Sequence, residues 1–288
     1  MYNAGLVLEG GGMRGMFTAG ILDFFLEKNI NFKEIIGVSA GACHACSYLS
    51  SQKGRAKDIS IDYLEDKRYC SGYSLIKTGD LFGADFIYDD IPNKLNIFDN
   101  KAFMQNESEF FATVTNVKTG KAEYLPIKDL SKNKDIVAIR ASASLPMVSN
   151  IIKINEEEYL DGGIADSIPL RQSIKNGFSK NVVILTQPKG YLKSPNKLMP
   201  VIKMKYKKYP KFIEKMEDRH LRYNETIDFI DEQERRHNIF VLRPNNKLIV
   251  DRVEKDKSKL ICVYTLGYNM AKTKYNDLLS YLETPPKP

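Results

Sequence analysis

The residues best suited to chemistry in this chain stand in three short, glycine-rich clusters. The first reads Gly-Val-Ser-Ala-Gly at 37–41 and directly follows a short apolar run. This order predicts a strand, a sharp turn and a helix, with Ser39 held in a strained backbone conformation at the turn. The small residues on either side, here Gly37, Ala40 and Gly41, avoid clashes that larger side chains would make in such a turn. We therefore interpret Ser39 as a nucleophile whose hydroxyl projects above a sheet.

The second cluster lies upstream and is suited to holding a negative charge. Successive glycines let backbone N–H groups converge, and the start of the following helix adds a positive dipole. We expect the amides of Gly11 and Gly12 to stabilise the oxyanion of a tetrahedral intermediate, with Arg14 adding positive charge or shaping the loop. The members of this anion-binding loop are Gly10, Gly11, Gly12, Met13, Arg14 and Gly15.

The same loop also matches the Gly-x-Gly-x-x-Gly pattern of dinucleotide-binding proteins. That pattern expects an acidic residue at the end of the second strand, where it binds a ribose. Here the strand runs into Val38 and Ser39, and the nearest acid, Glu34, stands at its start. A phosphate-binding P-loop would need Lys-Ser or Lys-Thr after the glycines, and the sequence has neither. We therefore favour the oxyanion interpretation and expect no cofactor.

None of the three histidines in the chain is placed to activate Ser39. His44 lies five residues after the serine on the same expected helix, so its ring should point away from the hydroxyl. His220 lies in a charged helical segment, and His237 precedes its strand rather than following it. We expect all three at the surface, and no Ser-His-Asp triad.

The third cluster, Asp161-Gly162-Gly163, supplies the remaining proton acceptor. An aspartate can act directly on a serine where a dry site raises its pKa and brings it within hydrogen-bond reach. An Asp-Gly pair is also a common hairpin signal, so this cluster gains its meaning from the other two. We interpret Asp161 as the general base of a Ser39–Asp161 dyad, with no metal in the site.

In this order, the three clusters resemble those of the patatin-like phospholipase family of bacterial type. The segment 141–146, Ala-Ser-Ala-Ser-Leu-Pro, is similar to the Ala- and Ser-rich segment that precedes the aspartate in that family. The resemblance covers about residues 4–187. Ser167 departs from the pattern, because the family often has asparagine there.

The resemblance implies a mechanism and a substrate class. It implies Ser39 as nucleophile, Asp161 as base, and Gly11, Gly12 and Arg14 as the oxyanion loop. It also implies hydrolysis of acyl esters in lipids without a metal. Two alternatives stay open, namely an esterase or thioesterase acting on soluble acyl substrates, and a membrane-binding regulatory protein without catalysis.

The elements around the clusters alternate between strands and helices, which predicts a mostly parallel central sheet covered by helices on both faces, a three-layer α/β/α fold. We expect strands at Ala4–Glu9, Glu34–Val38, Phe110–Val117, Ile151–Ile154, Glu158–Leu160, Val182–Thr186 and Ile239–Leu242. We expect helices at Met16–Lys28, Ala40–Ser51, Lys134–Ser142, within 211–237, and as one terminal helix at Lys257–Leu282.

The 288 residues, 43% of them hydrophobic, suit one large core with an appended part. We expect a catalytic core at 1–190, followed by a basic, helix-rich extension at 191–288. The extension should contribute one further core strand at about 239–243. Segment 81–88, which is aromatic and glycine-punctuated, is interpreted either as the wall of an acyl pocket or as an ordinary packed loop.

The net charge of +7 is concentrated between residues 189 and 215. The lysines of this segment are Lys189, Lys193, Lys197, Lys203, Lys205, Lys207, Lys208, Lys211 and Lys215. Such a segment suits peripheral contact with an anionic membrane surface, at which Tyr206, Tyr209 and Phe212 would insert, or it is a solvated basic face. No nucleic-acid motif accompanies the charge, so we expect no nucleic-acid partner.

The cysteine content and the N-terminal sequence indicate in which cellular compartment the protein is expected. Four cysteines are too few for a disulfide scaffold in a chain of this length, and Cys43 and Cys46 are interpreted as small packing residues of a buried helix. The sequence shows neither a signal peptide nor an apolar run that would span a membrane. We therefore expect a cytoplasmic protein, peripheral at the inner membrane face if its basic segment contacts lipid.

Overall fold

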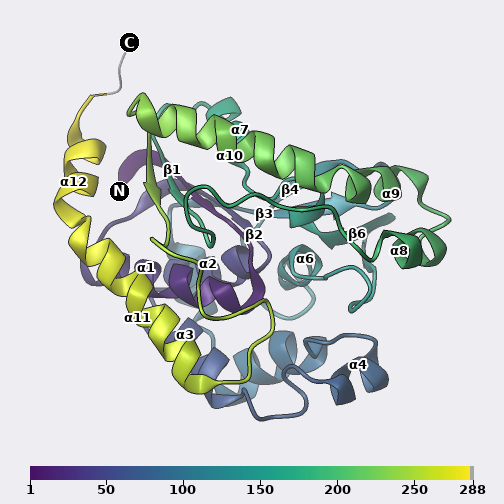
Figure 1. Cartoon of the computed structure of the whole chain (residues 1–288). Helices are drawn as coiled ribbons and strands as arrows, with labels where there is room; N and C mark the ends of the chain where they lie inside the picture. Colours follow the sequence, from purple (N-terminus) through teal and green to yellow (C-terminus); the bar gives the residue numbers. More distant parts are fainter. Residues whose placement is uncertain (286–288) are drawn as a thin grey trace.

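In the computed structural model, which describes residues 1–285, eight strands form one sheet between two helical layers (Figure 1). The strands are β1 (Tyr2–Leu8), β2 (Phe32–Val38), β3 (Glu109–Asn116), β4 (Ala122–Pro126), β5 (Ile152–Ile154), β6 (Glu157–Asp161), β7 (Asn181–Ile184) and β8 (Ile239–Leu242). The sheet order is β5-β6-β3-β2-β1-β7-β8, and β4 also pairs with β3. Strands β3, β2, β1, β7 and β8 run parallel, whereas β4, β5 and β6 pair antiparallel. The predicted three-layer α/β/α class is confirmed.

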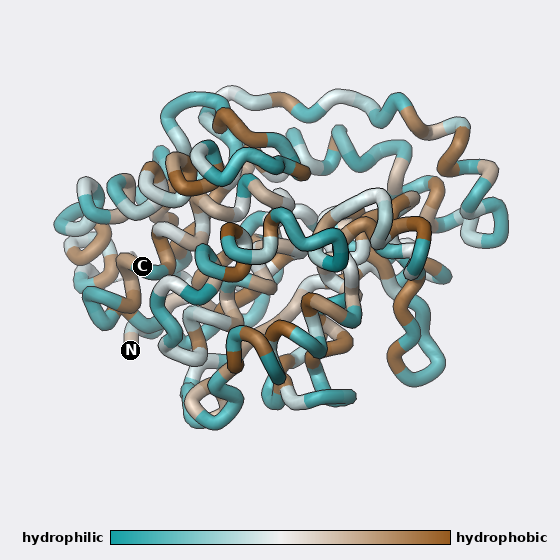
Figure 2. The backbone as a smooth tube through the Cα atoms, turned by 90° about the horizontal axis from the view of Figure 1, so that it is seen from below, coloured by the Kyte–Doolittle hydropathy of each residue, from teal (hydrophilic) through white to brown (hydrophobic). Residues whose placement is uncertain are grey.

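Helices cover both faces of this sheet. The α-helices are α1 (Met16–Glu27), α2 (Ala40–Leu49), α3 (Arg55–Asp62), α4 (Gly72–Thr78), α5 (Asn100–Gln105), α6 (Ile136–Ser142), α7 (Leu170–Lys175), α8 (Met199–Lys205), α9 (Pro210–Glu217), α10 (Arg219–Arg235), α11 (Lys257–Thr273) and α12 (Tyr275–Glu283). Two 3₁₀ turns, η1 (Gly12–Gly15) and η3 (Gly162–Ile164), and a π-helix, η2 (Phe86–Leu95), complete the set. Figure 2 shows brown and teal stretches alternating along the chain, as expected for helices that bury one face.

The side chains of β1 show how the two faces are built. Leu6 and Leu8 belong to the hydrophobic cluster that contains residues of α1, α2 and α11, whereas Val7 belongs to the cluster with α7 and α10. Successive residues of a strand point to opposite faces, so an unbroken apolar run is buried on both sides. The central strands are apolar for this reason.

The single terminal helix expected at 257–282 is wrong, because the chain turns at Lys274 between α11 and α12. Helix α11 packs along α1, where the rings of Phe24 and Tyr268 lie 5.4 Å apart. Helix α12 packs instead at the N-terminal ends of β7 and β8. There the Tyr281 hydroxyl donates to the Asn238 carbonyl at 2.8 Å. Tertiary packing against two surfaces therefore divides a segment whose sequence is helical throughout.

Strands β2 and β6 meet end to end along the same edge of β3. Val38, the last residue of β2, pairs with Thr113, and Asp161, the last residue of β6, pairs with Val114. Strand β4 pairs with the same two β3 residues and so occupies the opposite edge. Because β2 and β6 run in opposite directions, their carboxyl ends arrive at adjacent positions on β3.

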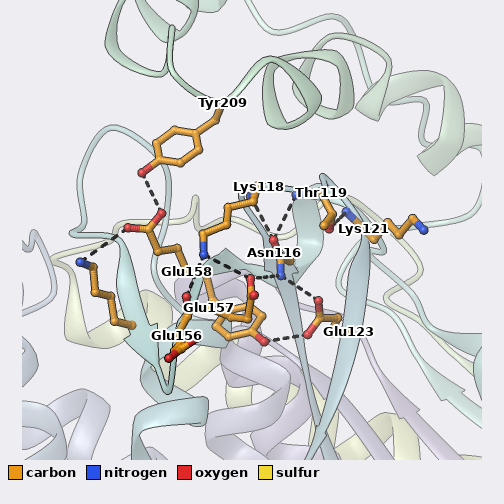
Figure 3. A network of polar contacts seen from close by, with 11 residues as sticks. Asn116, Lys118, Thr119, Lys121, Glu123, Glu156, Glu157, Glu158 and Tyr209 are labelled. Carbon is orange, nitrogen blue, oxygen red and sulfur yellow. Dashed lines mark hydrogen bonds and ion pairs between the residues drawn. The ribbon is translucent and has the colours of Figure 1, made fainter.

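A network of polar contacts holds the other end of β6 to β3 (Figure 3). The Asn116 side-chain amide donates to Glu123 and to Glu157, at 2.9 Å each. The hydroxyl of Tyr159 donates to Glu123 at 2.7 Å, and that of Tyr209 donates to Glu158 at 2.9 Å. These contacts fix the pairing of β6, and with it the place where β6 ends.

Candidate active site

Ser39 occupies the turn between β2 and α2 in a strained backbone conformation. Its φ and ψ are 54° and −122°, values that a residue with a Cβ rarely adopts. The Ser39 N–H donates to the Ser142 hydroxyl at 2.9 Å, which ties the turn to α6. Helix α2 approaches the sheet so closely that a Cβ on Gly41 would lie 2.7 Å from the Leu8 carbonyl oxygen. The strand, strained serine and helix expected from 37–41 are all present.

Asp161 ends β6 beside this turn and is 3% exposed. It lines, together with Ser39, a small polar cavity of about 30 Å³. One carboxylate oxygen, Oδ1, accepts the Gly163 N–H at 2.7 Å, while Oδ2 has no hydrogen bond of normal geometry among the described residues. Burial raises the pKa of Asp161, and the Ser39 hydroxyl and the Arg219 charge oppose that rise. A buried carboxylate with a raised pKa has the property that a base needs near neutral pH.

The main chain of Arg252, in the C-terminal part of the chain, contacts the glycine loop. Gly12 has a φ of +57°, and a Cβ there would lie 2.4 Å from the Arg252 carbonyl oxygen. That same oxygen accepts the Met13 N–H at 3.0 Å, and the Arg14 N–H donates to the Gly11 carbonyl at 3.3 Å. The Met13 and Arg14 amides are therefore engaged in holding the loop. Within residues 1–285, the Gly10, Gly11 and Gly12 amides have no acceptor, and the two predicted oxyanion donors are among them.

An apolar cavity of about 170 Å³ opens on the other side of Ser39. Residues Phe82, Ile87 and Tyr88 line it, so segment 81–88 forms part of a pocket wall. The other apolar lining residues include Met16, Ile59, Tyr69, Phe98, Leu130, Ile136, Ile139 and Leu145. This cavity can accommodate a long apolar group attached to a carbonyl that lies at Ser39.

The two cysteines of α2 also line the apolar cavity as free thiols. Burial raises the pKa of Cys43 to about 11, and that of Cys46 is raised for the same reason. Both thiols are therefore protonated near neutral pH and act as apolar lining.

The surface position expected for His44 is wrong. His44 is half-buried and lines the apolar cavity together with Ser39. Its ring lies over Gly15, where a Cβ would come within 2.7 Å of Nε2. Burial lowers the pKa of His44 to about 4, so the ring is neutral near neutral pH. Within residues 1–285 it forms no hydrogen bond with Ser39, whereas His237 is exposed as expected.

Membrane insertion is also contradicted for Tyr206 and Phe212, whereas Tyr209 is half-buried and its insertion stays untested. Tyr206 and Phe212 are core residues, with exposures of 2% and 0%, and their rings lie 4.8 Å apart. The Tyr206 hydroxyl accepts the Met147 N–H at 3.1 Å. The exposed large apolar side chains of this region are instead Leu192, Leu198, Val201 and Met204.

Three cations that the sequence analysis did not assign to the site line the polar cavity. Lys193, Arg219 and Arg252 join Arg14 there. They lie in separate segments of the last third of the chain, in no recognised motif. The only sequence signal was an excess of positive charge, which does not distinguish a site residue from a surface one.

Residues 1–285 contain neither a metal-binding cluster nor a membrane-spanning helix. No three His, Cys, Asp or Glu side chains are grouped as a metal site would require. In the same part of the chain, no helix is both long and apolar enough to cross a membrane.

Comparisons with known proteins identify the family of the chain. The family model for patatin-like phospholipases matches residues 6–174, more than half of the chain. The chain therefore belongs to the patatin-like phospholipase family, a class of carboxylic ester hydrolases. A second model, for a domain of unknown function (DUF6363), matches residues 209–283.

Two curated relatives are similar to the chain over part of their length. An uncharacterized protein of Escherichia coli strain K12, YjjU, is 29% identical over 195 residues, 66% of this chain and 54% of that protein. The probable lipid hydrolase 463L of Invertebrate iridescent virus 6 is 26% identical over 202 residues, 62% of this chain and 66% of that protein. The chain thus spans about half of the first relative and just under two thirds of the second. VipD from Legionella pneumophila aligns structurally with a TM-score of 0.49 and 12% identity, over 96% of this chain and 67% of that chain.

Proposed function

We propose that this protein hydrolyses carboxylic esters of lipids, with Ser39 as nucleophile and Asp161 as base. The observation that carries the proposal is the meeting of two strand ends on β3, which brings a strained serine to a buried carboxylate. The apolar cavity beside Ser39 suits a fatty acyl chain, and family membership agrees with this substrate class.

In the first half of the proposed reaction, the Ser39 oxygen attacks the ester carbonyl carbon and Asp161 takes the hydroxyl proton. The resulting oxyanion accepts hydrogen bonds from the Gly11 and Gly12 amides. As the intermediate collapses, the bond to the alcohol oxygen breaks and Asp161 returns its proton to that oxygen. The alcohol leaves, and the acyl group remains on Ser39.

In the second half, water attacks the acyl carbon and gives a proton to Asp161. The bond to the serine oxygen then breaks, and the proton returns to Ser39, which releases the fatty acid. The unpartnered Oδ2 of Asp161 supplies the acceptor in both halves. His44, neutral and without a hydrogen bond to Ser39 in the described structure, has no part in these steps.

A fluorophosphonate probe tests the nucleophile. It should add covalently to Ser39, seen by mass spectrometry of the digested protein, because an activated hydroxyl attacks phosphorus as it attacks a carbonyl. Ser39→Ala should abolish both labelling and release of fatty acid, while Ser194→Ala, a change at an exposed serine, should leave both intact. Labelling at a different serine would contradict the proposal.

The two alternatives predict different results. A hydrolase of soluble esters or thioesters would label at Ser39 but turn over short soluble substrates in preference to lipid. A membrane-binding regulator would bind vesicles with no turnover and no labelling of the folded protein.

We also propose that α8 contacts an anionic membrane surface, with the protein peripheral on the cytoplasmic side. Leu198, Val201 and Met204 are exposed apolar residues in and just before this helix, and lysines flank them. Lys203 is engaged in an ion pair with Glu217. Among residues 1–285, Lys197, Lys207 and Lys208 are exposed and form no ion pair, and the exposed Lys205 donates to the Met147 carbonyl at 3.3 Å.

A further inference from the structure

Four cations converge on the polar cavity beside Ser39. Arg14 comes from the glycine loop, and the other three are Lys193, Arg219 and Arg252. Within residues 1–285, none of the four forms an ion pair with a carboxylate. The Nε of Arg14 is buried and makes no hydrogen bond in this part of the chain.

The two carboxylates of the cavity are bound by uncharged donors. Glu9 accepts the Tyr223 hydroxyl at 2.8 Å and the Thr186 N–H at 2.6 Å. Asp161 accepts the Gly163 N–H. When Lys193 is protonated, four cations face two carboxylates, so the cavity then carries an excess of two positive charges. Such an excess, partly out of water, is costly until an anion offsets it.

These cations are held in place by neighbours that also shape the catalytic loops. The Lys193 main chain is bound on both sides by the Asn224 side chain, at 2.8 and 3.1 Å. The Lys193 ammonium lies 3.9 Å from the ring centre of Tyr223. Arg219 donates through Nε to the Gly163 carbonyl. Both cations therefore sit at a fixed place relative to Asp161.

The remaining cation marks the mouth of the cavity. Arg252 is exposed, and its carbonyl oxygen holds the Met13 N–H of the glycine loop. A ligand anion can thus enter from solvent past Arg252, while Lys193 and Arg219 meet it further in. Burial, together with the charges of the neighbouring arginines, lowers the pKa of Lys193 to about 7.

We propose that residues 191–285 form an extension that completes the active site of a 1–190 core by binding the phosphate of a glycerophospholipid. Lys193, Arg219 and Arg252 would be the specificity-determining residues of this phosphate subsite. Arginine guanidinium groups suit phosphate oxygens, since they give paired, charge-assisted hydrogen bonds. The inference rests on the proposed function, in which Ser39 attacks the ester.

The closeness of the cations to Ser39 selects among phosphate-bearing esters. In a glycerophospholipid only a short stretch of the glycerol backbone separates the phosphate from the scissile ester. In an acyl-coenzyme A thioester a long pantetheine arm lies between them. Because the cations and Ser39 line one small cavity, the glycerophospholipid is the ligand that fits.

A matched pair of substrates tests the subsite. Dihexanoyl phosphatidylglycerol and dihexanoylglycerol share their acyl chains and differ by the phosphate headgroup. The wild-type kcat/KM should be roughly tenfold to a hundredfold higher for the phospholipid, the range expected for a few charge-assisted hydrogen bonds. Lys193→Gln, Arg219→Gln and Arg252→Gln should each lower that ratio by roughly tenfold. Hexanoyl-coenzyme A should be hydrolysed at similar rates by the wild type, Lys193→Gln and Arg252→Gln, whereas Arg219→Gln, which removes a charge beside Asp161, is compared only through the ratio of the two lipid substrates.

Two variants control for loss of charge alone. Lys197→Gln lies in the same segment as Lys193, and Arg235→Gln lies on the same helix as Arg219, both at exposed positions outside the cavity. Both should keep the wild-type ratio. An equal loss on the two substrates in the cavity variants would overturn the subsite and assign its cations to the support of Asp161. A loss confined to hexanoyl-coenzyme A would overturn the choice of ligand.

Calorimetric binding separates this inference from the proposed hydrolysis. Ser39→Ala protein should bind dihexanoyl phosphatidylglycerol, and adding Arg252→Gln to it should weaken that binding by roughly tenfold. Binding with this dependence, but no hydrolysis by the wild type, would overturn the proposed function and keep the subsite. Hydrolysis through Ser39, with binding that does not depend on Arg252 or Lys193, would overturn the phosphate subsite and keep the proposed function.

Discussion

Ser39 stands between two cavities that differ in chemistry and in origin. On one side lies the apolar cavity of about 170 Å³, whose walls come from residues 12–145. On the other lies the polar cavity of about 30 Å³, closed by segments around 193, 219 and 252. Apolar burial is non-directional, so the first cavity tolerates varied chains. Charge-assisted hydrogen bonds from fixed cations are directional, so the polar cavity should select a headgroup.

The largest expected effect on activity comes from Asp161, because the proposed base acts on every ester, whichever cavity binds the rest of the substrate. Asp161→Asn keeps the shape of the side chain and removes proton acceptance, so kcat should fall by roughly 10² to 10⁴-fold on every ester. Because the pKa of Asp161 is raised, wild-type activity should fall on acidification at a pH above the ordinary aspartate value of 3.8. A pH–rate profile of both proteins checks this. A His44→Ala variant as inactive as Asp161→Asn would instead revive a histidine base.

Filling the apolar cavity should lower the hydrolysis of long-chain esters and leave that of short-chain esters nearly unchanged. Ala56 is buried in its wall, so Ala56→Phe should shorten the space for the acyl chain. Each methylene that can no longer be buried costs about 0.8 kcal/mol, so two or three lost methylenes correspond to roughly tenfold or more in kcat/KM. The loss should appear with p-nitrophenyl palmitate and be small with p-nitrophenyl butyrate. Equal losses on both esters would mean that the cavity does not hold the chain.

The basic face outside the polar cavity should matter for vesicles and not for soluble esters. Changing Lys205, Lys207 and Lys208 together to glutamine should weaken binding to phosphatidylglycerol vesicles by about tenfold, since a lysine near such a surface contributes up to about 1 kcal/mol. Higher salt should have the same effect through screening. Co-sedimentation measures the binding, and p-nitrophenyl butyrate hydrolysis serves as the control. Unchanged sedimentation at low salt would make this segment a solvated face.

The smallest expected effect is a pH dependence of headgroup preference. Lys193 has a pKa of about 7, so its charge is present below that pH and lost above it. Charged Lys193 binds phosphate, so the kcat/KM ratio of dihexanoyl phosphatidylglycerol to dihexanoylglycerol should fall by roughly threefold as pH rises from about 6 to about 8. The ratio cancels the titration of Asp161. Lys193→Arg should flatten the profile, and an unchanged slope in that variant would exclude Lys193 as its source.

The contrast between the cavities also explains what the sequence could predict. The strained turn at 37–41 and the glycine loop are local patterns, so the sequence predicts their position and most of the central strands. The cavity cations lie far apart in sequence, and their meeting depends on how α10 and the chain before α11 pack on the core. No local pattern carries that information.

Two errors have physical causes that can be named. Ser39 is the residue before α2, not part of it, so helical geometry does not relate its side chain to His44. The ring of His44 instead occupies space that Gly15 leaves free. Around Tyr206 and Phe212, apolar and lysine residues alternate at helical spacing. That spacing predicts an amphipathic helix without telling whether protein or lipid covers its apolar face.

The end-to-end meeting of β2 and β6 makes the dyad sensitive to strand register. A slip of β6 by one residue along β3 would move Asp161 by about 3.3 Å and turn its side chain to the other face of the sheet. Every catalytic side chain would still be present, yet none could act. The hydrogen bonds of Asn116 and Tyr159 at the far end of β6 therefore set the distance between nucleophile and base, although neither residue touches the site.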